Sequence, residues 1–302
     1  MRVRFRGLDV VLSGTRRWPA LHALFLVGPA IGWILAFSIV PLLIVIGLSF
    51  MTSAGAGIVK HEITLENYSK IWTTFLYRRV LLESLLIGVE ATAITILLGY
   101  PVGYYLGRLK NKYTALLVLL IVLPFWTSYL VRIFAWLVML MDNGAINWFL
   151  LSLRVTSTPI RLLYTHLGVV IGIVYSALPF AILPIYAVIA GIDEDLISAS
   201  HVLGANDQQT FREVVLPLSV PGLMAAVILT FIYAVGSFLA PAILGGNSAV
   251  MISNVIATVF LGLFNWPFAS ALTVSLLVIM LLVLSIATRI VSLDTIYGAR
   301  PR

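Results

Sequence analysis

The chain has 302 residues, of which 61% are hydrophobic and only 10% are charged, and its formal net charge is +7. A mean hydropathy of +1.07 is far above that of a soluble domain, so the composition predicts a polytopic membrane protein. There is no cysteine, which excludes disulfides, thiol catalysis and cysteine metal sites. The basic residues form short clusters beside apolar segments and no continuous basic face, which argues against nucleic-acid binding.

The first apolar segment, residues 23–50, follows five arginines, an arrangement that secretory signals share. It is too long for the apolar core of a signal peptide. We therefore expect a retained membrane span.

Six segments are long and apolar enough to cross a bilayer of about 30 Å, which predicts an all-α fold of six transmembrane helices. They cover residues 23–50, 85–106, 114–140, 167–192, 221–244 and 268–288. Gly, Asn and Pro residues separate the last two spans. The short apolar stretch between them, residues 255–264, is expected in or near the outer interface.

An even number of spans places both termini on the same side. Assigning the N-terminus to the cytoplasm puts 12 Lys and Arg residues inside and 6 outside, as the positive-inside rule favours. The expected organisation is a cytoplasmic N-terminal tail (1–22), a six-helix domain (23–292) and a cytoplasmic C-terminal tail (293–302). A polar hairpin, residues 193–217, interrupts the domain on the cytoplasmic side, and its acidic character suggests a docking surface.

Capping and helix-stop residues in the polar hairpin predict two short helices. Asp193 is expected to cap the first helix, and Gly204 to end it in the left-handed conformation. Asn206 caps the second helix in a capping box with Gln209, and Pro217 marks the end of that helix. The expected apolar faces are Leu196, Ala199 and Leu203 on the first helix, and Phe211, Val214 and Val215 on the second.

The spacing within the polar hairpin resembles the EAA loop of binding-protein-dependent ABC importer permeases, whose pattern is Glu-Ala-Ala, Gly, then Ile-x-Leu-Pro. The corresponding positions are Ser198, Ala199, Ser200, Gly204, Val214, Leu216 and Pro217. Ser198 replaces the glutamate of the pattern, Ser200 its second alanine and Val214 its isoleucine. With the acid lost at Ser198, an ion pair from that position is no longer implied.

Five further segments, in their order and spacing, resemble the spermidine/putrescine-type branch of these permeases. They are residues 97–108, 123–136, 142–150, 174–186 and 265–272. The resemblance implies a type I ABC importer permease-like fold in the bacterial inner membrane, with the polar hairpin as the element that couples to the ATPase. It also implies three partners: an ABC ATPase dimer, a second homologous permease and a periplasmic solute-binding protein.

Sequence motifs for chemistry within this chain are missing. Without a G-x-x-x-x-G-K-[ST] phosphate loop, ATP and magnesium are expected on the partner ATPase, and no cofactor is expected here. The four histidines are dispersed without metal-ligand spacing, and G-x-S-x-G is absent from the sequence. We therefore expect neither a metal site nor enzymatic activity.

Two charges fall inside predicted spans, where an ionisable group costs at least about 2.5 kcal/mol unless it finds water or a partner. Glu90 and Arg132 pair with each other or with neighbouring backbone, or Glu90 faces the pathway and attracts a cationic substrate, or the charges lie at a shallow, hydrated depth. The candidate substrate-pathway residues are Glu90, Trp126, Tyr129, Arg132 and Asp142. Trp126, Tyr129 and Trp136 are expected around Arg132, where aromatic faces either hold ammonium groups or serve in packing.

Small residues and prolines mark the second and fourth spans. Gly99, Gly103 and Gly107 recur at every fourth position, which permits close helix packing or flexing during gating. Pro101 interrupts the hydrogen bonding of the same helix, and Pro179 and Pro184 are expected to kink the fourth span.

Two alternatives remain open at this stage. One is a self-sufficient secondary transporter or channel, against which stand the missing repeat, the few intramembrane acids and the polar hairpin. The other is an importer of the same class for a different solute: a phosphonate, an opine, thiamine or ferric iron.

Overall fold

The computed structural model describes residues 27–29, 31–55 and 57–290. The predicted tails, residues 1–22 and 293–302, lie outside the described residues, as do residues 23–26 of the first expected span. Six helical stretches are long and apolar enough to cross a membrane. They are Val27–Ser49, Phe75–Arg108, Tyr129–Ser152, His166–Ala190, Asp207–Val235 and Trp266–Ile286. The predicted all-α architecture with six such helices is confirmed.

The elements follow one another along the chain with short connections. In order they are η2 (Leu35–Ile39), α3 (Val40–Ser49), β1 (Thr52–Gly55), β2 (Ile58–Lys60), α4 (Glu66–Thr73), α5 (Phe75–Arg108), α6 (Thr114–Val122), η3 (Leu123–Trp126), α7 (Tyr129–Leu140), α8 (Ala145–Ser152), α9 (His166–Ala190), α10 (Glu194–Val202), α11 (Asp207–Thr210), η4 (Phe211–Val215), α12 (Leu216–Val235), η5 (Pro241–Gly245), α13 (Ile252–Ala257), η6 (Thr258–Gly262) and α14 (Trp266–Ile290).

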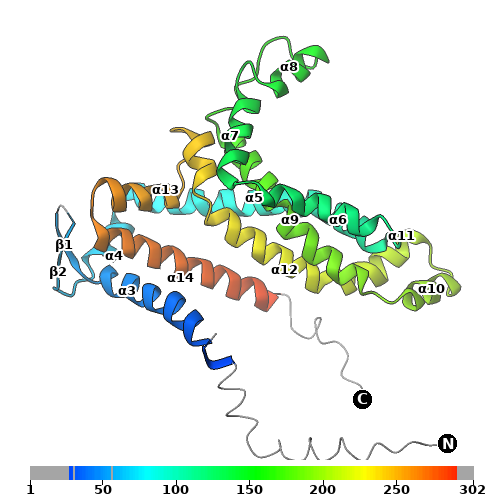
Figure 1. Ribbon diagram of the computed structural model, residues 1–302, viewed down its shortest axis with the longest axis horizontal. Helices are drawn as coiled ribbons and strands as arrows, with labels where there is room; N and C mark the ends of the chain where they lie inside the picture. The colour runs from blue at the N-terminus through cyan, green and yellow to red at the C-terminus, as the bar shows by residue number, and fades with distance from the viewer. Residues whose placement is uncertain (1–26, 30, 56, 291–302) are drawn as a thin grey trace, which may run out of the picture.

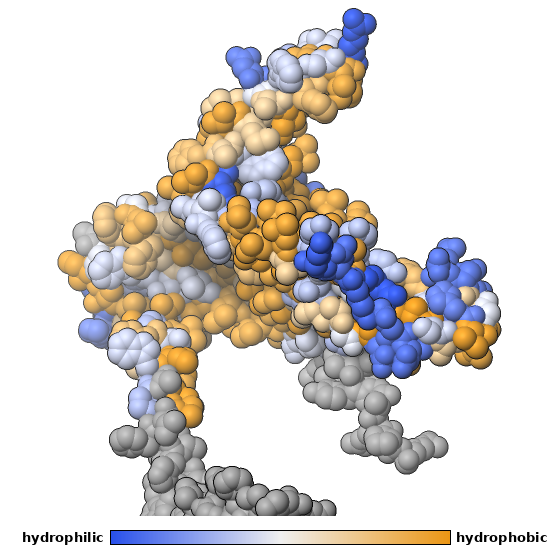
Figure 2. All heavy atoms as spheres, turned by 45° about the vertical axis from the view of Figure 1, so that its right-hand side comes forward, coloured by the Kyte–Doolittle hydropathy of each residue, from blue (hydrophilic) through white to orange (hydrophobic). Residues whose placement is uncertain are grey.

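Three long helices, α5, α9 and α12, pack against one another and form the centre of the fold. α14 and α3 pack together beside them (Figure 1). The antiparallel strands β1 and β2 lie at one end of the bundle with α4, and α10 and α11 lie at the other end. On the face shown in Figure 2 the surface is largely apolar, and hydrophilic side chains gather mainly toward its extremities.

Helices α5 and α9 approach each other closely along three successive turns. A Cβ built on Gly99 would lie 2.9 Å from Ala181 Cβ, and one on Gly103 would lie 2.8 Å from Ile185 Cγ2. A Cβ on Gly107 would lie 2.6 Å from Ile189 Cγ2. The three glycines of α5, called the glycine ladder below, and their three partners on α9 are each spaced four residues apart. The ladder therefore lies along one stripe of α9, which supports a role in close helix packing.

The third expected span, residues 114–140, is not one helix. It divides into α6, η3 and α7, and Thr127 and Ser128 have extended backbone angles. The change from α-helix to 3-10 helix coincides with Pro124, and the chain leaves helical geometry three residues later, at Thr127. α7 and α8 turn away from α5 and α9 (Figure 1), so Tyr129–Ser152 replaces 114–140 as the third candidate span.

The predicted helix end at Pro217 is also wrong. α11, η4 and α12 follow without interruption, so the second hairpin helix and the fifth span form one helical stretch, Asp207–Val235. The π-turn of η4 closes with the Leu216 N–H donating to the Phe211 carbonyl. Pro217 then occupies the first turn of α12, a position that requires no N–H from it. Likewise, α5 continues through Pro101, and α9 through Pro179 and Pro184.

The short apolar stretch before the last span forms most of a separate short helix, α13 with η6. The Ile252 N–H at its start donates to the Ser84 hydroxyl of α5 over 2.7 Å, a buried bond. Ser253 Oγ donates to the Ser237 carbonyl over 2.6 Å, and Asn254 Nδ2 to the Phe238 carbonyl over 3.2 Å. These bonds hold the short helix against the end of the bundle opposite the polar hairpin.

The glycine ladder yields a stability prediction. Gly107→Ala is expected to lower the free energy of unfolding by about 1–3 kcal/mol, because the new methyl group overlaps Ile189. The thermal midpoint of the purified protein in detergent measures this change.

Gly47→Ala in α3 is the matched control, since no described atom lies within 4 Å of the Cβ it would add. We expect no loss from this control, because alanine favours the helix over glycine. Equal midpoints for Gly107→Ala and the wild type would contradict the close packing of α5 on α9.

Candidate functional site

The polar hairpin has the two caps that the sequence predicts. The Asp193 carboxylate accepts a hydrogen bond from the Asp195 N–H at 3.0 Å, and Gly204 follows α10 with φ +91°. Asn206 and Gln209 form a reciprocal capping box, with 2.9 Å between donor and acceptor in each bond. The two bonds satisfy backbone donors that helix α11 would otherwise leave open.

A partly buried contact joins the two helices of the polar hairpin. The hydroxyls of Ser200 and Thr210 lie 2.8 Å apart, and Thr210 is buried. Ile197 and Val215 are buried beside them. Ser200, which replaces the second alanine of the EAA pattern, thus fastens the first hairpin helix to the second.

The expected apolar face of the first hairpin helix points outward. Leu196 is 50% exposed and Leu203 is 88% exposed, while the buried side chain is Ile197. Val202 is 87% exposed and adds to the outward apolar surface. On the second helix Val215 is buried and Phe211 and Val214 are half-buried, so its expected inward face is confirmed. Of the EAA-like positions, Ser198, Ala199, Gly204 and Pro217 are exposed, and Ser200, Val214 and Leu216 are half-buried.

Aromatic side chains attach the polar hairpin to the central bundle. The Phe211 ring lies edge-on to Tyr104 at 5.2 Å and to Tyr100 at 6.2 Å between ring centroids. The hydroxyls of Tyr100 and Ser219 lie 2.8 Å apart. Because both tyrosines belong to α5, the contacts join the hairpin to the helix that carries the glycine ladder.

An ion pair links the start of α10 in the polar hairpin to the loop that follows α5. Lys110 Nζ, in the loop after α5, lies 2.7 Å from Glu194 Oε1. The hydrogen bond and charge of Lys110, and more weakly the charge of Arg108, hold the pKa of Glu194 below its ordinary value. Both side chains are more than half exposed, so solvent screens the pair and its contribution to stability is small.

The two intramembrane charges find different partners from the predicted ones. Glu90 Oε2 lies 2.6 Å from His166 Nε2, so pairing of Glu90 with Arg132 is wrong. Glu90 is on α5 and His166 begins α9, and these two helices pack together along their length. Both side chains of the Glu90–His166 pair remain about half exposed.

Arg132 lies against aromatic rings. Its guanidinium carbon is 4.8 Å from the centre of the Phe125 ring and 5.6 Å from that of Tyr129. Its Nε atom is buried, and no described side chain or backbone group accepts a hydrogen bond from it. Stacking on two rings therefore supplies the stabilisation that an acid was expected to give.

The rings at Arg132 continue into an aromatic cluster, Phe125, Tyr129, Phe180 and Tyr233. Phe180 lies 5.4 Å from Phe125 and 5.2 Å from Tyr233 between ring centroids. Beside the cluster is a hollow of about 380 Å³, lined by Tyr129, Ile232, Tyr233, Gly236, Ser237, Phe238 and Leu239. The Tyr129 and Ser237 hydroxyls lie 3.3 Å apart at this hollow.

The remaining sequence candidates lie outside the aromatic cluster. Trp126 is 77% exposed, Trp136 packs edge-on against Tyr175 at 5.4 Å, and Asp142 is exposed in the turn after α7. The structure thus brings Tyr129 and Arg132 together and leaves Glu90, Trp126 and Asp142 apart from them. The sequence analysis missed Phe180 and Tyr233, which come from α9 and α12, and Ser237, which follows α12. It also missed His166, whose position at the edge of a predicted span was the available signal.

Comparison with known proteins defines the class. The family described as "Binding-protein-dependent transport system inner membrane component" matches residues 99–293, and this chain belongs to it. The matched region begins in α5 and includes both the polar hairpin and the aromatic cluster. The protein is therefore a multi-pass permease component of the inner membrane.

Individual members of this family are similar to the chain over most of its length. The spermidine/putrescine transport system permease protein PotB of Salmonella typhimurium is 40% identical over 259 residues, covering 86% of this chain and 90% of that protein. PotB of Escherichia coli is 39% identical with coverage of 86% and 94%, and PotB of Haemophilus influenzae is 40% identical with coverage of 85% and 90%.

Solved structures show the same fold. A chain of the bacterial alginate ABC transporter in complex with a pentasaccharide-bound periplasmic protein has a TM-score of 0.70 at 19% identity, covering 91% of this chain and 94% of that chain. An inward-facing chain of the MetNI methionine ABC transporter has a TM-score of 0.54 at 21% identity, with coverage of 74% and 96%. The expected ABC importer permease-like fold is confirmed.

The capping box allows a local test. Asn206→Ala is expected to destabilise the start of the second hairpin helix by about 0.5–2 kcal/mol, because the N–H of Gln209 loses its acceptor. Faster hydrogen exchange at the amides of residues 207–211 would report the loss.

Gln208→Ala, at an exposed position two residues after Asn206, serves as the control for this exchange measurement. We expect it to leave protection unchanged. Equal exchange in the two variants would show that the cap does not stabilise the hairpin.

Proposed function

We propose that this chain is a permease subunit of an ATP-driven importer that moves spermidine and putrescine into the cytoplasm. The observation that carries the proposal is 40% identity to PotB proteins across 86% of the chain. The six apolar helices and the permease fold supply the membrane pathway that such a subunit requires.

The proposed partners follow from the family. A second, homologous permease completes the pathway, a periplasmic solute-binding protein delivers the substrate, and an ABC ATPase dimer binds ATP and magnesium. The polar hairpin is the proposed ATPase contact, with both termini of the chain on the same cytoplasmic side. The exposed side chains of Leu196, Val202 and Leu203 support this assignment, since they provide an apolar surface that a partner would cover.

The aromatic cluster is the proposed place of substrate contact. Protonated amines bind over aromatic faces, and Tyr129 and Tyr233 border the hollow beside the cluster. Arg132 already places a cation on two of these rings. We propose that these rings attract polyamines more than Glu90 or Asp142 does. Glu90 already has a partner, because its carboxylate is paired with His166.

Uptake of labelled putrescine and spermidine tests the function directly. Cells carrying the complete partner set are expected to accumulate both polyamines only when this chain is present. Unlabelled polyamines should compete, whereas a phosphonate, an opine, thiamine and ferric iron should not. Assembly with the ATPase but no polyamine uptake would retain the importer assignment and overturn the substrate.

Coupling through the polar hairpin is tested by Gly204→Arg. An arginine at φ +91° is strained, and its side chain projects from the proposed docking surface, so the ATPase is expected to dissociate and uptake to fall at least tenfold. Co-purification of the ATPase and polyamine uptake measure the two effects.

Gly55→Arg is the matched control, because Gly55 has φ +88° and likewise has no described atom within 4 Å of an added Cβ. It lies at the opposite end of the bundle, where we expect ATPase binding to be kept. Retention of the ATPase and of uptake by Gly204→Arg would overturn the role assigned to the hairpin.

A further inference from the structure

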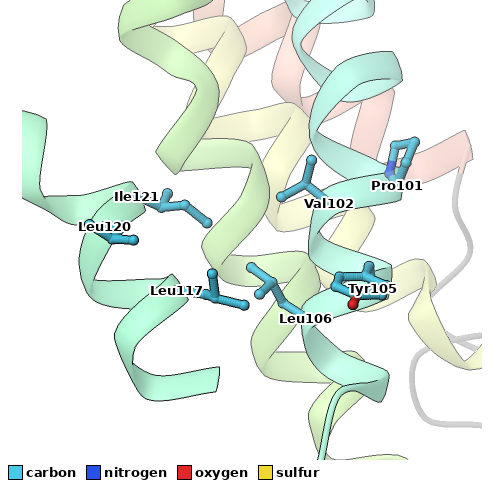
Figure 3. Close-up of a pocket in the computed structure, with 7 residues that line it drawn as sticks. All are labelled: Pro101, Val102, Tyr105, Leu106, Leu117, Leu120 and Ile121. Carbon is cyan, nitrogen blue, oxygen red and sulfur yellow. The ribbon is translucent and has the colours of Figure 1, made fainter. Parts of the chain in front are cut away.

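Helix α6 stands away from the bundle and leaves a groove between itself and α5. All nine residues of α6 are described, and none is buried. The groove has a volume of about 530 Å³ and is lined by Pro101, Val102, Tyr105, Leu106, Leu117, Leu120 and Ile121. Figure 3 shows the side chains of Leu117 and Ile121 on α6 directed toward Val102 and Leu106 on α5. The Tyr105 hydroxyl is the one polar side-chain group in this described lining.

The length of the groove fits within one leaflet of a bilayer. Pro101 precedes Arg108, the last residue of α5, by seven residues, which is about 10 Å at about 1.5 Å per residue. Thr114, the first residue of α6, precedes Ile121 by seven residues, which is also about 10 Å on the same rise. One leaflet of hydrocarbon is about 15 Å thick. A partner helix crossing the membrane would need a groove of about twice this length, whereas a lipid acyl chain would not.

Basic side chains surround the polar end of the groove, where α5 ends and α6 begins. Arg108, Lys110 and Lys112 fall within five residues, and the intervening loop contains no acid. Lys110 is paired with Glu194, which Asp193 and Asp195 flank. Within the described part of the chain, no acidic oxygen lies within 4.0 Å of a side-chain nitrogen of Arg108 or Lys112. Two cations are therefore open to an anion at the level where lipid phosphates lie.

We propose that the groove between α5 and α6 binds an anionic phospholipid of the leaflet beside the polar hairpin. One acyl chain lies between Val102 and Leu106 of α5 and Leu117 of α6. The phosphate is bound by Arg108 and Lys112, because basic residues at the membrane surface attract anionic headgroups and an apolar groove alone would accept any lipid. An anionic lipid has a net negative charge for these two side chains to neutralise, whereas a zwitterionic lipid has none.

The position of this site allows a bound lipid to influence the polar hairpin through the loop between α5 and α6. Lys110 lies between the two lipid-binding cations in the sequence and holds Glu194 at the start of α10. A phosphate at Arg108 and Lys112 also fixes the loop that carries Lys110. The lipid would thus stabilise the attachment of the hairpin to α5 without contacting the hairpin itself.

Native mass spectrometry of the complete transporter, released from nanodiscs of equal parts phosphatidylglycerol and phosphatidylcholine, tests this binding. The wild type is expected to retain phosphatidylglycerol in preference to phosphatidylcholine. The double variant Arg108→Gln, Lys112→Gln is expected to lower that preference by about tenfold to thirtyfold. The double variant Arg78→Gln, Arg161→Gln removes the same charge from exposed positions and should keep the preference.

A second variant tests the groove separately from the charges. Val102→Trp fills the groove and should remove the retained lipid, whereas Leu86→Trp, on an exposed face of the same helix, should not. Size-exclusion chromatography confirms assembly of each variant. An unchanged preference in the Arg108, Lys112 variant, an equal loss in the Arg78, Arg161 variant, or retention of lipid by Val102→Trp would each overturn the proposal. So would efficient cross-linking of Val102→Cys to the second permease.

Discussion

The close approach of α5 to α9 is the contact on which the rest of the structure depends. Glycines at three successive turns of α5 admit Ala181, Ile185 and Ile189 of α9. In a bilayer, lipid tails are as apolar as the side chains, so helices associate through such close packing more than through the hydrophobic effect. Once these helices are joined, α5 also holds α12 through Tyr100 and Ser219, α13 through Ser84, and the polar hairpin through Tyr104.

Local signals in the sequence predicted the elements whose structure depends on neighbouring residues. The capping box at Asn206 and Gln209, the left-handed Gly204 and the glycine ladder all follow from spacing within one segment. The same reasoning failed at the prolines. Pro217 was read as a helix end, yet a π-turn places it in the first turn of α12. The sequence did not indicate the division of residues 114–140 either, where α6 changes to η3 beside Pro124 and the chain becomes extended at Thr127.

The candidate site was harder to predict because its residues come from separate helices. Tyr129 and Arg132 are three residues apart on α7, and their association follows from helical periodicity. Phe180 and Tyr233 belong to α9 and α12, and no feature of one segment indicates that their rings meet. Similarly, the partner of Glu90 depends on the register of α5 and α9, which hydrophobic patterning does not specify. The resemblance to a known family supplied function where the physical signals of single segments could not.

The unbroken helical stretch Asp207–Val235 has a mechanical consequence. It carries the capping box of the polar hairpin at one end and Tyr233 of the aromatic cluster near the other, about 39 Å away at about 1.5 Å per residue. A rigid rod of that length that tilts by about 5° at its hairpin end displaces Tyr233 by about 3 Å. That displacement is comparable to the difference between a ring in contact with a cation and one that has released it. The polar hairpin and Tyr233 thus lie at opposite ends of one helical stretch, and a rigid-body tilt of that stretch at one end would move the other.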